Sequence, residues 1–436
     1  WRGVQRSGGA EEVPAMPRPT IDQLREQVSG SVVTPADDGY DEARAVYHAM
    51  IDRRPAVVVG VRTSADVAVA VEFARESQLP LAIRGGGHSV PGFGTIDDGV
   101  VIDLAGMREV SVDPEQRVAR AQGGATWGDF NAATHEHSLA TTGGIISTTG
   151  VAGLTLGGGI GYLTRGHGLA CDNLVGAEVV TADGRVIHAS ADENADLLWA
   201  LKGGSGNFGV ATALEFELHP LSDVYGGPMF FELEHARDIL EWYRDFIAEA
   251  PEAFGGFPAF QIAPPLPFIP EERHGDTLIA FVSCWAGPLA EGEAIVGRIR
   301  DVAPVVAEHV GPMPYPAINS AFDALVPAGL QHYWKANFVR ELSDAAIDAH
   351  VEHGPRVPVV NSTMHLYPIN GAAQRFGPDD AAWGHRDANF APVIAGMWPD
   401  PADNVANTAW VKAVSYTHLT LPTRSCQCRS RWSPYH

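Results

Sequence analysis

The chain has 436 residues, of which 45% are hydrophobic and 19% are charged, and its formal net charge is −23 at pH 7. This length exceeds one compact core and predicts about two or three domains. The acidic excess argues against nucleic acid and anionic membrane surfaces as partners. No apolar run approaches the ~18 residues that a membrane-spanning helix needs, so no membrane association is expected.

The first half of the chain alternates short strands and helices after a helical lead-in expected over residues 16–50. The predicted strands are Ala56–Val61, Leu81–Ile83, Val100–Leu104 and Val210–Leu218. The predicted helices are Ala65–Ser77, which Ser64 caps, Thr126–His137 and Asp196–Leu201, and a hairpin over Gly176–Ser190 turns at Asp183-Gly184. Glycine-rich loops at the strand ends indicate an α+β domain over residues 51–220.

After His219-Pro220 the composition changes, because prolines and aromatic residues become more frequent. The predicted strands here are Phe257–Ile262, Leu278–Trp285, Tyr333–Val339 and Ser362–Tyr367, and the predicted helices are Glu234–Ala248 and Leu289–Ala303. This alternation predicts a second domain over residues 221–398, an antiparallel sheet backed by helices. The family resemblance described below implies that residues 399–413 begin a return toward the first domain.

Both ends of the chain differ from its interior. The chain begins with Trp1 and its first methionine is Met16, so residues 1–15 are interpreted as non-native upstream sequence. No signal peptide is visible, which predicts a cytoplasmic protein. A helix beginning near Asn404 is expected to be interrupted at Val414, because the following ten residues resemble a translated sequencing adapter. Val414–His436 is therefore interpreted as an unpacked artefact.

Cysteine usage points to a reducing compartment. Cys426 and Cys428 fall within the terminal segment and are not taken as a metal or redox site, and no other metal site is expected. Cys171 and Cys284 remain, and two cysteines make no disulfide framework.

Glycine-rich loops are the most informative feature of the sequence. Arg84-Gly85-Gly86-Gly87-His88-Ser89 directly follows a predicted strand. A second glycine- and threonine-rich segment, Thr141 to Gly161, contains Gly144, Thr148, Gly150, Gly153, Gly158 and Gly161. Consecutive glycines leave backbone N–H groups free to line a concavity, which holds an anion without a basic side chain. One such run is typical of a plain tight loop, whereas several in one domain favour a phosphate site.

Two reactive side chains accompany these loops. His88 ends the first loop, and Cys171 lies between Gly168 and Asn173 in the segment Gly166–Leu174. Each has an ordinary structural interpretation, since a lone histidine is commonly a hydrogen-bonded core residue and a lone cysteine a buried apolar one. Their joint placement next to glycine loops is what favours a chemical role.

These ordered motifs resemble the FAD-linked oxidases typified by berberine bridge enzyme, within the p-cresol methylhydroxylase/vanillyl-alcohol oxidase group, over roughly Asp41 to Lys412. The resemblance implies a two-part FAD-binding domain of the p-cresol methylhydroxylase type and a separate substrate domain. It implies that FAD contacts Arg84, Gly85, Gly86, Gly87, His88, Ser89, Gly144, Thr148, Gly150, Gly153, Gly158, Gly161, Cys171 and Asn173, and that Val210 lies against the adenine. It further implies covalent bonds from His88 to the 8-methyl group of the flavin and from Cys171 to its C6 position.

A second glycine pattern is rejected as a cofactor motif. Gly204-Ser205-Gly206-Asn207-Phe208-Gly209 matches the dinucleotide pattern Gly-x-Gly-x-x-Gly. That motif must follow a strand and open a helix, whereas here a helix precedes it and a strand follows.

A base is needed for the proton that leaves with a hydride, and one predicted strand offers candidates. Thr363, His365 and Tyr367 share one face because side chains alternate along a strand. The alternative is a solvated sheet face. We expect His365 and Tyr367 to be catalytic, with His332, Tyr333 and His385 next in order. The resemblance also places an acid–base tyrosine near the C-terminus, outside this sequence.

The sequence thus predicts an FAD-dependent oxidase acting on an alcohol, either a sugar or a hydroxyl of a secondary metabolite, with molecular oxygen as acceptor. A flavin-dependent dehydrogenase or oxidative-cyclisation enzyme remains an alternative, and so does a non-catalytic flavin- or ligand-binding protein. The oligomeric state stays open.

Overall fold

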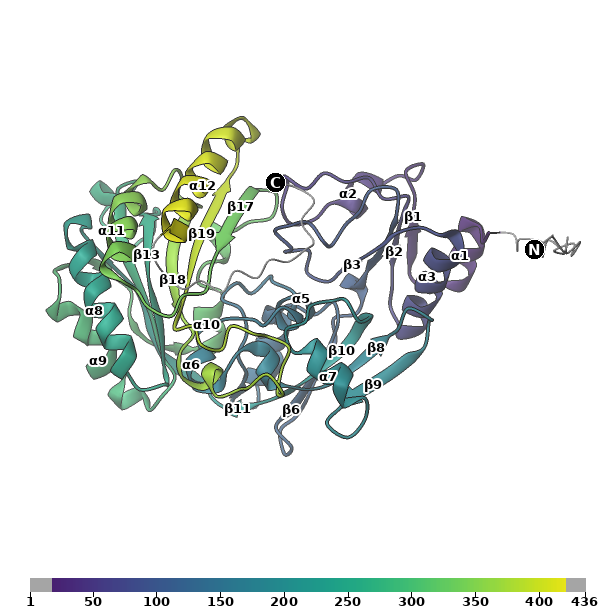
Figure 1. The fold of residues 1–436 in the computed structure, drawn as a ribbon, viewed down its shortest axis with the longest axis horizontal. Coiled ribbons are helices and arrows are strands. Elements are labelled where there is room, and N and C mark those ends of the chain that lie inside the picture. Colours follow the sequence, from purple (N-terminus) through teal and green to yellow (C-terminus); the bar gives the residue numbers. More distant parts are fainter. Residues whose placement is uncertain (1–17, 421–436) are drawn as a thin grey trace, which may run out of the picture.

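The computed structural model describes residues 18–420, with side chains to Ser415. The chain forms two halves that lie side by side (Figure 1). The N-terminal half contains two smaller sheets, and the C-terminal half is built on one large antiparallel sheet. The predicted α+β class is confirmed. In residues 18–420 no helix is both long and apolar enough to cross a membrane.

The first sheet has the order β1-β2-β4-β3, in which β2, β4 and β3 run parallel. Its strands are β1 Ser31–Val33, β2 Val57–Gly60, β3 Leu81–Arg84 and β4 Val100–Asp103, and its helices are α1 Ile21–Gln27, α2 Tyr40–Arg44 and α3 Ser64–Ser77. The N-cap of α3 is Thr63, not the predicted Ser64, because the Thr63 hydroxyl accepts from the Asp66 N–H and the Asp66 carboxylate returns a bond to the Thr63 backbone.

The second sheet has the order β5-β6-β10-β8-β9 and is antiparallel. Its strands are β5 Val110–Asp113, β6 Val118–Gln122, β8 Leu174–Val180, β9 Val186–Ser190 and β10 Val210–Glu217. The associated helices are α4 Trp127–His135, α5 Val151–Leu156, α6 Thr164–His167 and α7 Ala195–Leu201, and β7 Leu139–Ala140 pairs with β11 His219–Pro220. The predicted hairpin is confirmed as β8 and β9.

The large sheet has the order β15-β12-β14-β13-β18-β19-β17, and β16 also pairs with β12. Its strands are β12 Asp223–Phe231, β13 Phe254–Ile262, β14 Thr277–Trp285, β15 Val305–Glu308, β16 Gly311–Pro314, β17 Gln331–Ala336, β18 Thr363–Pro368 and β19 Phe390–Trp398. The helices of this half are α8 Ala236–Glu249, α9 Leu289–Val296, α10 Tyr315–Asn319, α11 Asp344–His353 and α12 Asn404–Thr420. The sequence pattern did not indicate β12 and β19, which contain the internal prolines Pro228 and Pro392.

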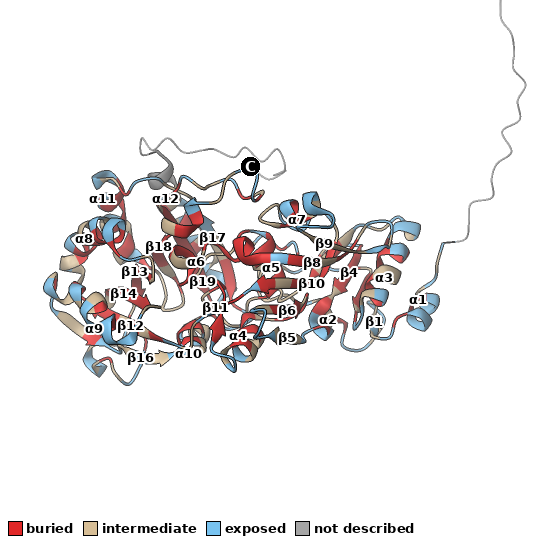
Figure 2. Cartoon of the chain, turned by 90° about the horizontal axis from the view of Figure 1, so that it is seen from below, coloured by how far each residue is buried: buried red, intermediate tan, exposed pale blue. Residues whose placement is uncertain are grey.

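The long helices α8, α9, α11 and α12 cover one face of the large sheet, whereas the short helix α10 packs against its other face. Figure 1 shows α8, α9 and α11 on the side away from the N-terminal half, and Figure 2 shows their outer faces exposed and the strands beneath them buried. In α8, Ile239, Tyr243 and Phe246 recur at helical spacing and pack on Met364 and Leu366 of β18. The other face of the sheet is therefore turned toward the glycine-rich loops.

The predicted interruption of the last helix is wrong. Helix α12 continues from Asn404 to Thr420, and the Val414 side chain is fully buried in the same core as α8 and β18. Val411 and Val414 are three residues apart and so lie on one helical face, which explains the continuity through this position. Residues 421–436, with Cys426 and Cys428, lie outside the described residues.

Replacing Val414 with alanine is expected to lower the free energy of unfolding by about 2 kcal/mol, because it leaves a cavity in the core. Val405 is a matched control on the same helix, since its side chain is 84% exposed, and Val405→Ala should change stability by less than about 0.5 kcal/mol. Urea denaturation of both variants measures the difference. Equal, negligible effects would restore the interpretation of this segment as unpacked.

Candidate functional site

The first glycine loop forms a nest of unpaired backbone donors. Within residues 18–420, the N–H groups of Gly86, Gly87, His88 and Ser89 have no hydrogen-bond acceptor. Gly87 has a φ of +74°, a conformation that glycine adopts without strain. Consecutive free N–H groups in such a turn suit the phosphate oxygens of a dinucleotide, so this loop fits the pyrophosphate of FAD.

The two predicted glycine loops meet back to back. A Cβ atom on Gly86 would lie 2.4 Å from the backbone nitrogen of Gly150, and one on Gly150 would lie 2.5 Å from that of Gly86. Gly161 approaches the second segment from the other end, where a Cβ would lie 1.7 Å from the carbonyl oxygen of Gly143. Any side chain at these positions would force the loops apart. Gly153 differs, because a Cβ there would meet nothing within 4 Å.

His88 is a neutral, half-buried imidazole held by the second loop. Its Nε2 lies 3.1 Å from the Thr148 hydroxyl, while Nδ1 makes only a 3.5 Å contact with the Thr149 hydroxyl. Burial, and secondarily the neighbouring His48, lowers the pKa of His88 to about 3. The ring therefore carries no proton on one nitrogen near neutral pH, which is the form that acts as a nucleophile.

Two residues around His88 were not predicted from the sequence. The Tyr47 ring stacks on His88 with centroids 3.6 Å apart, and His48 Nε2 donates to the His88 carbonyl at 2.9 Å. The His48 ring in turn lies 3.8 Å from that of His332 on β17. Tyr47 and His48 belong to the segment expected only as a lead-in. Their side-by-side aromatic character was the sole signal available.

His332 is buried, and neither of its ring nitrogens has a partner among the described residues. Burial is the main cause that lowers its pKa to about 3, with His48 and His88 contributing. An unpaired buried polar group costs roughly 1–3 kcal/mol. His332→Leu is therefore expected to raise the free energy of unfolding at pH 7 by about that amount.

His332→Leu should also weaken the fall of the unfolding free energy with decreasing pH. Between pH 6.5, the ordinary histidine pKa, and about 3, the unfolded chain binds a proton at this residue and the folded chain does not. Stability consequently falls on acidification, by up to about 1.4 kcal/mol per pH unit for one group. Unfolding free energies at pH 7 and pH 4.5 test this. A variant that is less stable at pH 7, or that keeps the parent slope, would contradict it.

Cys171 lies on the turn Ala170–Asn173 and is held by the end of the second glycine-rich segment, at Gly158 and Gly159. Its N–H donates to the Gly158 carbonyl at 2.9 Å, and the Ala170 N–H donates to the Gly159 carbonyl at 2.9 Å. The thiol is fully buried among Leu169, Ile369, Trp383 and neighbouring alanines. Burial, and then the adjacent Asp172 carboxylate, raises the pKa of the thiol.

Three of the residues expected to contact FAD use their side chains within the protein. The Arg84 guanidinium pairs with Asp103 at 2.7 Å and donates to the carbonyls of Ala43 and Ala45, so it anchors the segment leading to Tyr47. The Asn173 amide nitrogen donates to the His167 and Leu169 carbonyls, and its Oδ1 accepts from His219 Nε2 at 2.7 Å. The Ser89 hydroxyl accepts from the Phe93 N–H. These side chains are therefore engaged in holding the loops together.

The remaining predicted contacts lie at two separate places. The Gly144 carbonyl accepts from the buried Asn319 amide at 2.5 Å, which ties the second loop to α10. Val210 begins β10 and packs with Val180, Val57 and Val59 in the core of the first sheet, away from the Cys171 cluster.

The predicted face of β18 is correct. Met364 and Leu366 face the helices, whereas His365 and Tyr367 turn the other way with ring centroids 4.6 Å apart. Tyr367 packs against the cluster that contains Cys171 and against the one that contains Tyr47. Burial lowers the pKa of His365 to about 3 and raises that of Tyr367. The His365 imidazole is thus unprotonated at neutral pH, and the Tyr367 phenol keeps its proton.

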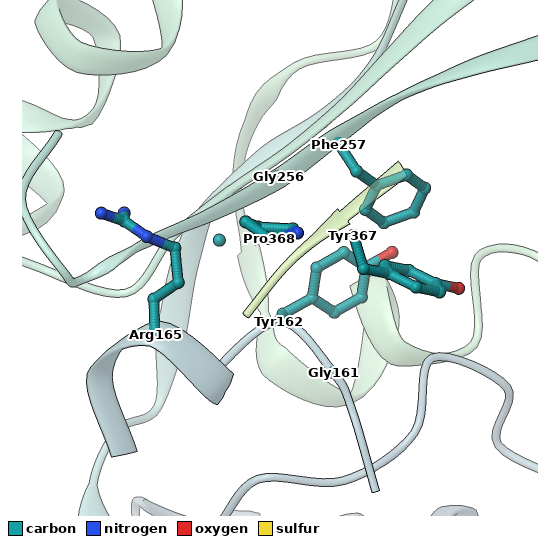
Figure 3. Close-up of a pocket in the computed structure, with 8 residues that line it drawn as sticks. Gly161, Tyr162, Arg165, Gly256, Phe257, Tyr367 and Pro368 are labelled. Atoms are coloured by element: carbon teal, nitrogen blue, oxygen red, sulfur yellow. The ribbon is translucent and has the colours of Figure 1, made fainter. Parts of the chain in front are cut away.

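A small pocket adjoins this face at the seam between the two halves (Figure 3). Tyr162 comes from the loop after Gly161 and gathers with Phe257 and Tyr367, while the Arg165 guanidinium points away from these rings. Phe257 lies 4.8 Å from Tyr367 and 6.1 Å from Tyr162, centroid to centroid. The Tyr162 hydroxyl has no partner among the described residues. Aromatic rings with one unpaired hydroxyl suit a planar, uncharged ligand group.

The other proposed bases lie elsewhere. Tyr333 is on the opposite face of β17, where Lys412 of α12 lies 5.6 Å from its ring, so it does not reach the β18 face. His385 stacks on Phe338 at 4.5 Å, beside Trp383. His332 alternates with Tyr333 and faces the His88 side.

Comparison with known proteins agrees with this architecture. The FAD binding domain family matches residues 55–190. An FAD-linked oxidoreductase of Bacillus subtilis is 30% identical over 397 residues, which cover 89% of this chain and 85% of the relative. The crystal structure of 6-hydroxy-D-nicotine oxidase from Arthrobacter nicotinovorans superposes with a TM-score of 0.79 at 25% identity, covering 90% of this chain and 86% of that one.

A second solved structure supports the fold alone. Glucooligosaccharide oxidase from Acremonium strictum has a TM-score of 0.78 at 22% identity, covering 92% of this chain and 87% of that one. The chain therefore belongs to the FAD-linked oxidoreductases that resemble berberine bridge enzyme, and it is an enzyme that binds FAD.

Proposed function

We propose that this protein is an FAD-dependent oxidase whose flavin is bonded to both His88 and Cys171. The observation that carries this proposal is the neutral His88 imidazole, which stands at the end of four unpaired backbone donors and leaves Nδ1 with only a 3.5 Å contact. Cys171 is supported by the Gly158–Gly159 carbonyls, and Tyr367 packs against both its cluster and that of Tyr47. Glucooligosaccharide oxidase carries a 6-S-cysteinyl, 8α-N1-histidyl FAD.

The β18 face supplies the proton chemistry. FAD, when bound, would supply the hydride acceptor, with molecular oxygen as the final electron acceptor. A ring nitrogen of His365 takes the proton that leaves the substrate hydroxyl, since its lowered pKa of about 3 keeps the ring unprotonated. The Tyr367 phenol, whose pKa is raised, donates a hydrogen bond and orients the substrate oxygen.

The lining favours one of the two alcohol classes. Phe257 and Tyr367 line the sheet side of the pocket, and Tyr162 lines it from the flavin-binding half. The His365 ring lies behind them, with its centroid 5.7 Å from that of Phe257 and 4.6 Å from that of Tyr367. These rings are uncharged at neutral pH, since burial lowers the pKa of His365 and raises those of both phenols. We therefore favour a neutral hydroxyl-bearing aromatic or other apolar metabolite, with an oligosaccharide as the second candidate.

An anaerobic substrate panel tests the proposal. The protein is mixed without oxygen with benzyl alcohol, 2-naphthalenemethanol, 4-(hydroxymethyl)benzoate or cellobiose, and bleaching of the flavin absorbance is followed. The neutral aromatic alcohols are expected to bleach the flavin, and admitted air should restore the colour and release hydrogen peroxide. Bleaching without reoxidation in air would indicate a dehydrogenase. A protein that no alcohol bleaches would support a binding role.

A further inference from the structure

A buried ion pair holds the cysteine turn from the opposite half of the molecule. Arg386 lies between β18 and β19, and Asp172 follows Cys171 directly. The two side chains pair at both oxygens, with Nη2 of Arg386 2.6 Å from Oδ1 of Asp172 and Nη1 2.8 Å from Oδ2. The Asp172 side chain has no exposed surface, and that of Arg386 is 12% exposed. A pair this well enclosed is screened little by solvent.

Further contacts fix both partners in place. Arg386 Nη1 also donates to the Ala373 carbonyl at 2.9 Å, and its guanidinium lies 5.0 Å from the Trp383 ring centroid. The Asp172 Oδ2 accepts from the Leu169 N–H at 2.8 Å, which closes the turn around Cys171. Its Oδ1 is the hydrogen-bond partner of the Cys171 sulfur, at 3.7 Å.

Trp383, which lies beside Arg386, also contacts Gly158 in the second glycine-rich segment. A Cβ on Gly158 would lie 2.8 Å from the Trp383 ring, and the Gly158 carbonyl accepts from the Cys171 N–H. Trp383, Arg386 and Asp172 therefore contact the cysteine turn on two sides. Displacement of any of them moves the sulfur.

We propose that Arg386, acting through Asp172, is the positioning residue that allows Cys171 to bond to the flavin. This inference rests on the Cys171 bond of the proposed function. The bond forms between sulfur and C6 and replaces the S–H and C6–H bonds. The two protons and two electrons released pass to molecular oxygen, which becomes hydrogen peroxide.

The physical reason is charge as well as position. A thiolate is the reactive form of cysteine, and the Asp172 carboxylate beside Cys171 disfavours it while the Arg386 cation favours it. Without Arg386 the carboxylate would be buried unpaired, a state that costs several kcal/mol. The turn would then open toward water and carry the sulfur away.

The test compares Arg386→Met with Arg375→Met. Arg375 is a matched control, because it lies in the same segment and pairs with Glu252, yet 62% of its side chain is exposed. In R386M the flavin should still precipitate with the protein in acid through His88. Mass spectrometry should show the flavin–Cys171 peptide reduced about tenfold or more. R375M should keep both peptides, and Arg386→Lys should recover part of the Cys171 peptide.

The outcomes separate this inference from the proposed function. A parent protein without a flavin–Cys171 peptide would overturn the Cys171 bond and this inference with it. A parent with that peptide and an R386M variant that keeps it in full would overturn the inference alone. If R386M does not fold, the double variant D172N/R386Q removes both charges and leaves none unpaired. Undiminished linkage in that variant overturns the inference, and diminished linkage supports it.

Discussion

Single replacement of His88 or Cys171 by alanine will leave the flavin attached to the protein in acid, and replacement of both will release it. Each side chain supplies one independent bond, so loss of one leaves the other. The surroundings support this: His88 is held by Thr148 and Tyr47, whereas Cys171 is held by Gly158 and Asp172. Trichloroacetic acid precipitation, followed by absorbance of pellet and supernatant and by peptide mapping, measures the result.

Cys284→Ala is the control for this experiment. Cys284 is as deeply buried as Cys171, but it lies in β14 and packs with Tyr162 and Tyr315. Its loss should leave both flavin peptides unchanged. Flavin that dissociates freely from the parent protein in acid would rule out covalent attachment. A C171A variant that releases all its flavin would show that His88 forms no bond.

Replacement of His365 by asparagine is expected to slow anaerobic flavin reduction by roughly 10²–10⁴-fold, the usual contribution of a general base. Tyr367→Phe should have a smaller effect and weaken substrate binding, because a phenol whose pKa is raised by burial donates a hydrogen bond and does not accept the proton. Stopped-flow measurement of the reduction rate against substrate concentration separates the two roles.

Thr363→Val serves as the control on the same strand face. Its hydroxyl donates to the Phe260 carbonyl within the sheet, so the variant should reduce its flavin at close to the parent rate. Flavin content must be equal in all variants, which absorbance at equal protein concentration establishes. An unchanged reduction rate in H365N would exclude His365 as the base. The search would then move to His332, whose buried ring nitrogens are unpaired.

Local patterns determined much of this protein. The Asp183-Gly184 turn specified the β8–β9 hairpin, and the alternation along Ser362–Tyr367 placed His365 and Tyr367 on the face away from the helices. These results depend on residues near one another in the chain, where periodicity and turn chemistry act directly. The glycine runs likewise indicated the nest at Gly86–Ser89, and this inference did not depend on any long-range contact.

Only the tertiary structure decided which partners these residues have. Tyr47 and His48 come to His88 from 40 residues away, and Arg386 reaches Asp172 across 214 residues. Arg84 and Asn173 are residue types that commonly contact ligands, yet their side-chain N–H groups donate to backbone carbonyls of neighbouring loops. The Val414 side chain is buried because α12 lies against β17 and β19, although the segment that follows has no recognisable helical pattern. Sequence periodicity predicts which face of a helix or strand a side chain occupies. The packing of distant segments decides which residues that face contacts.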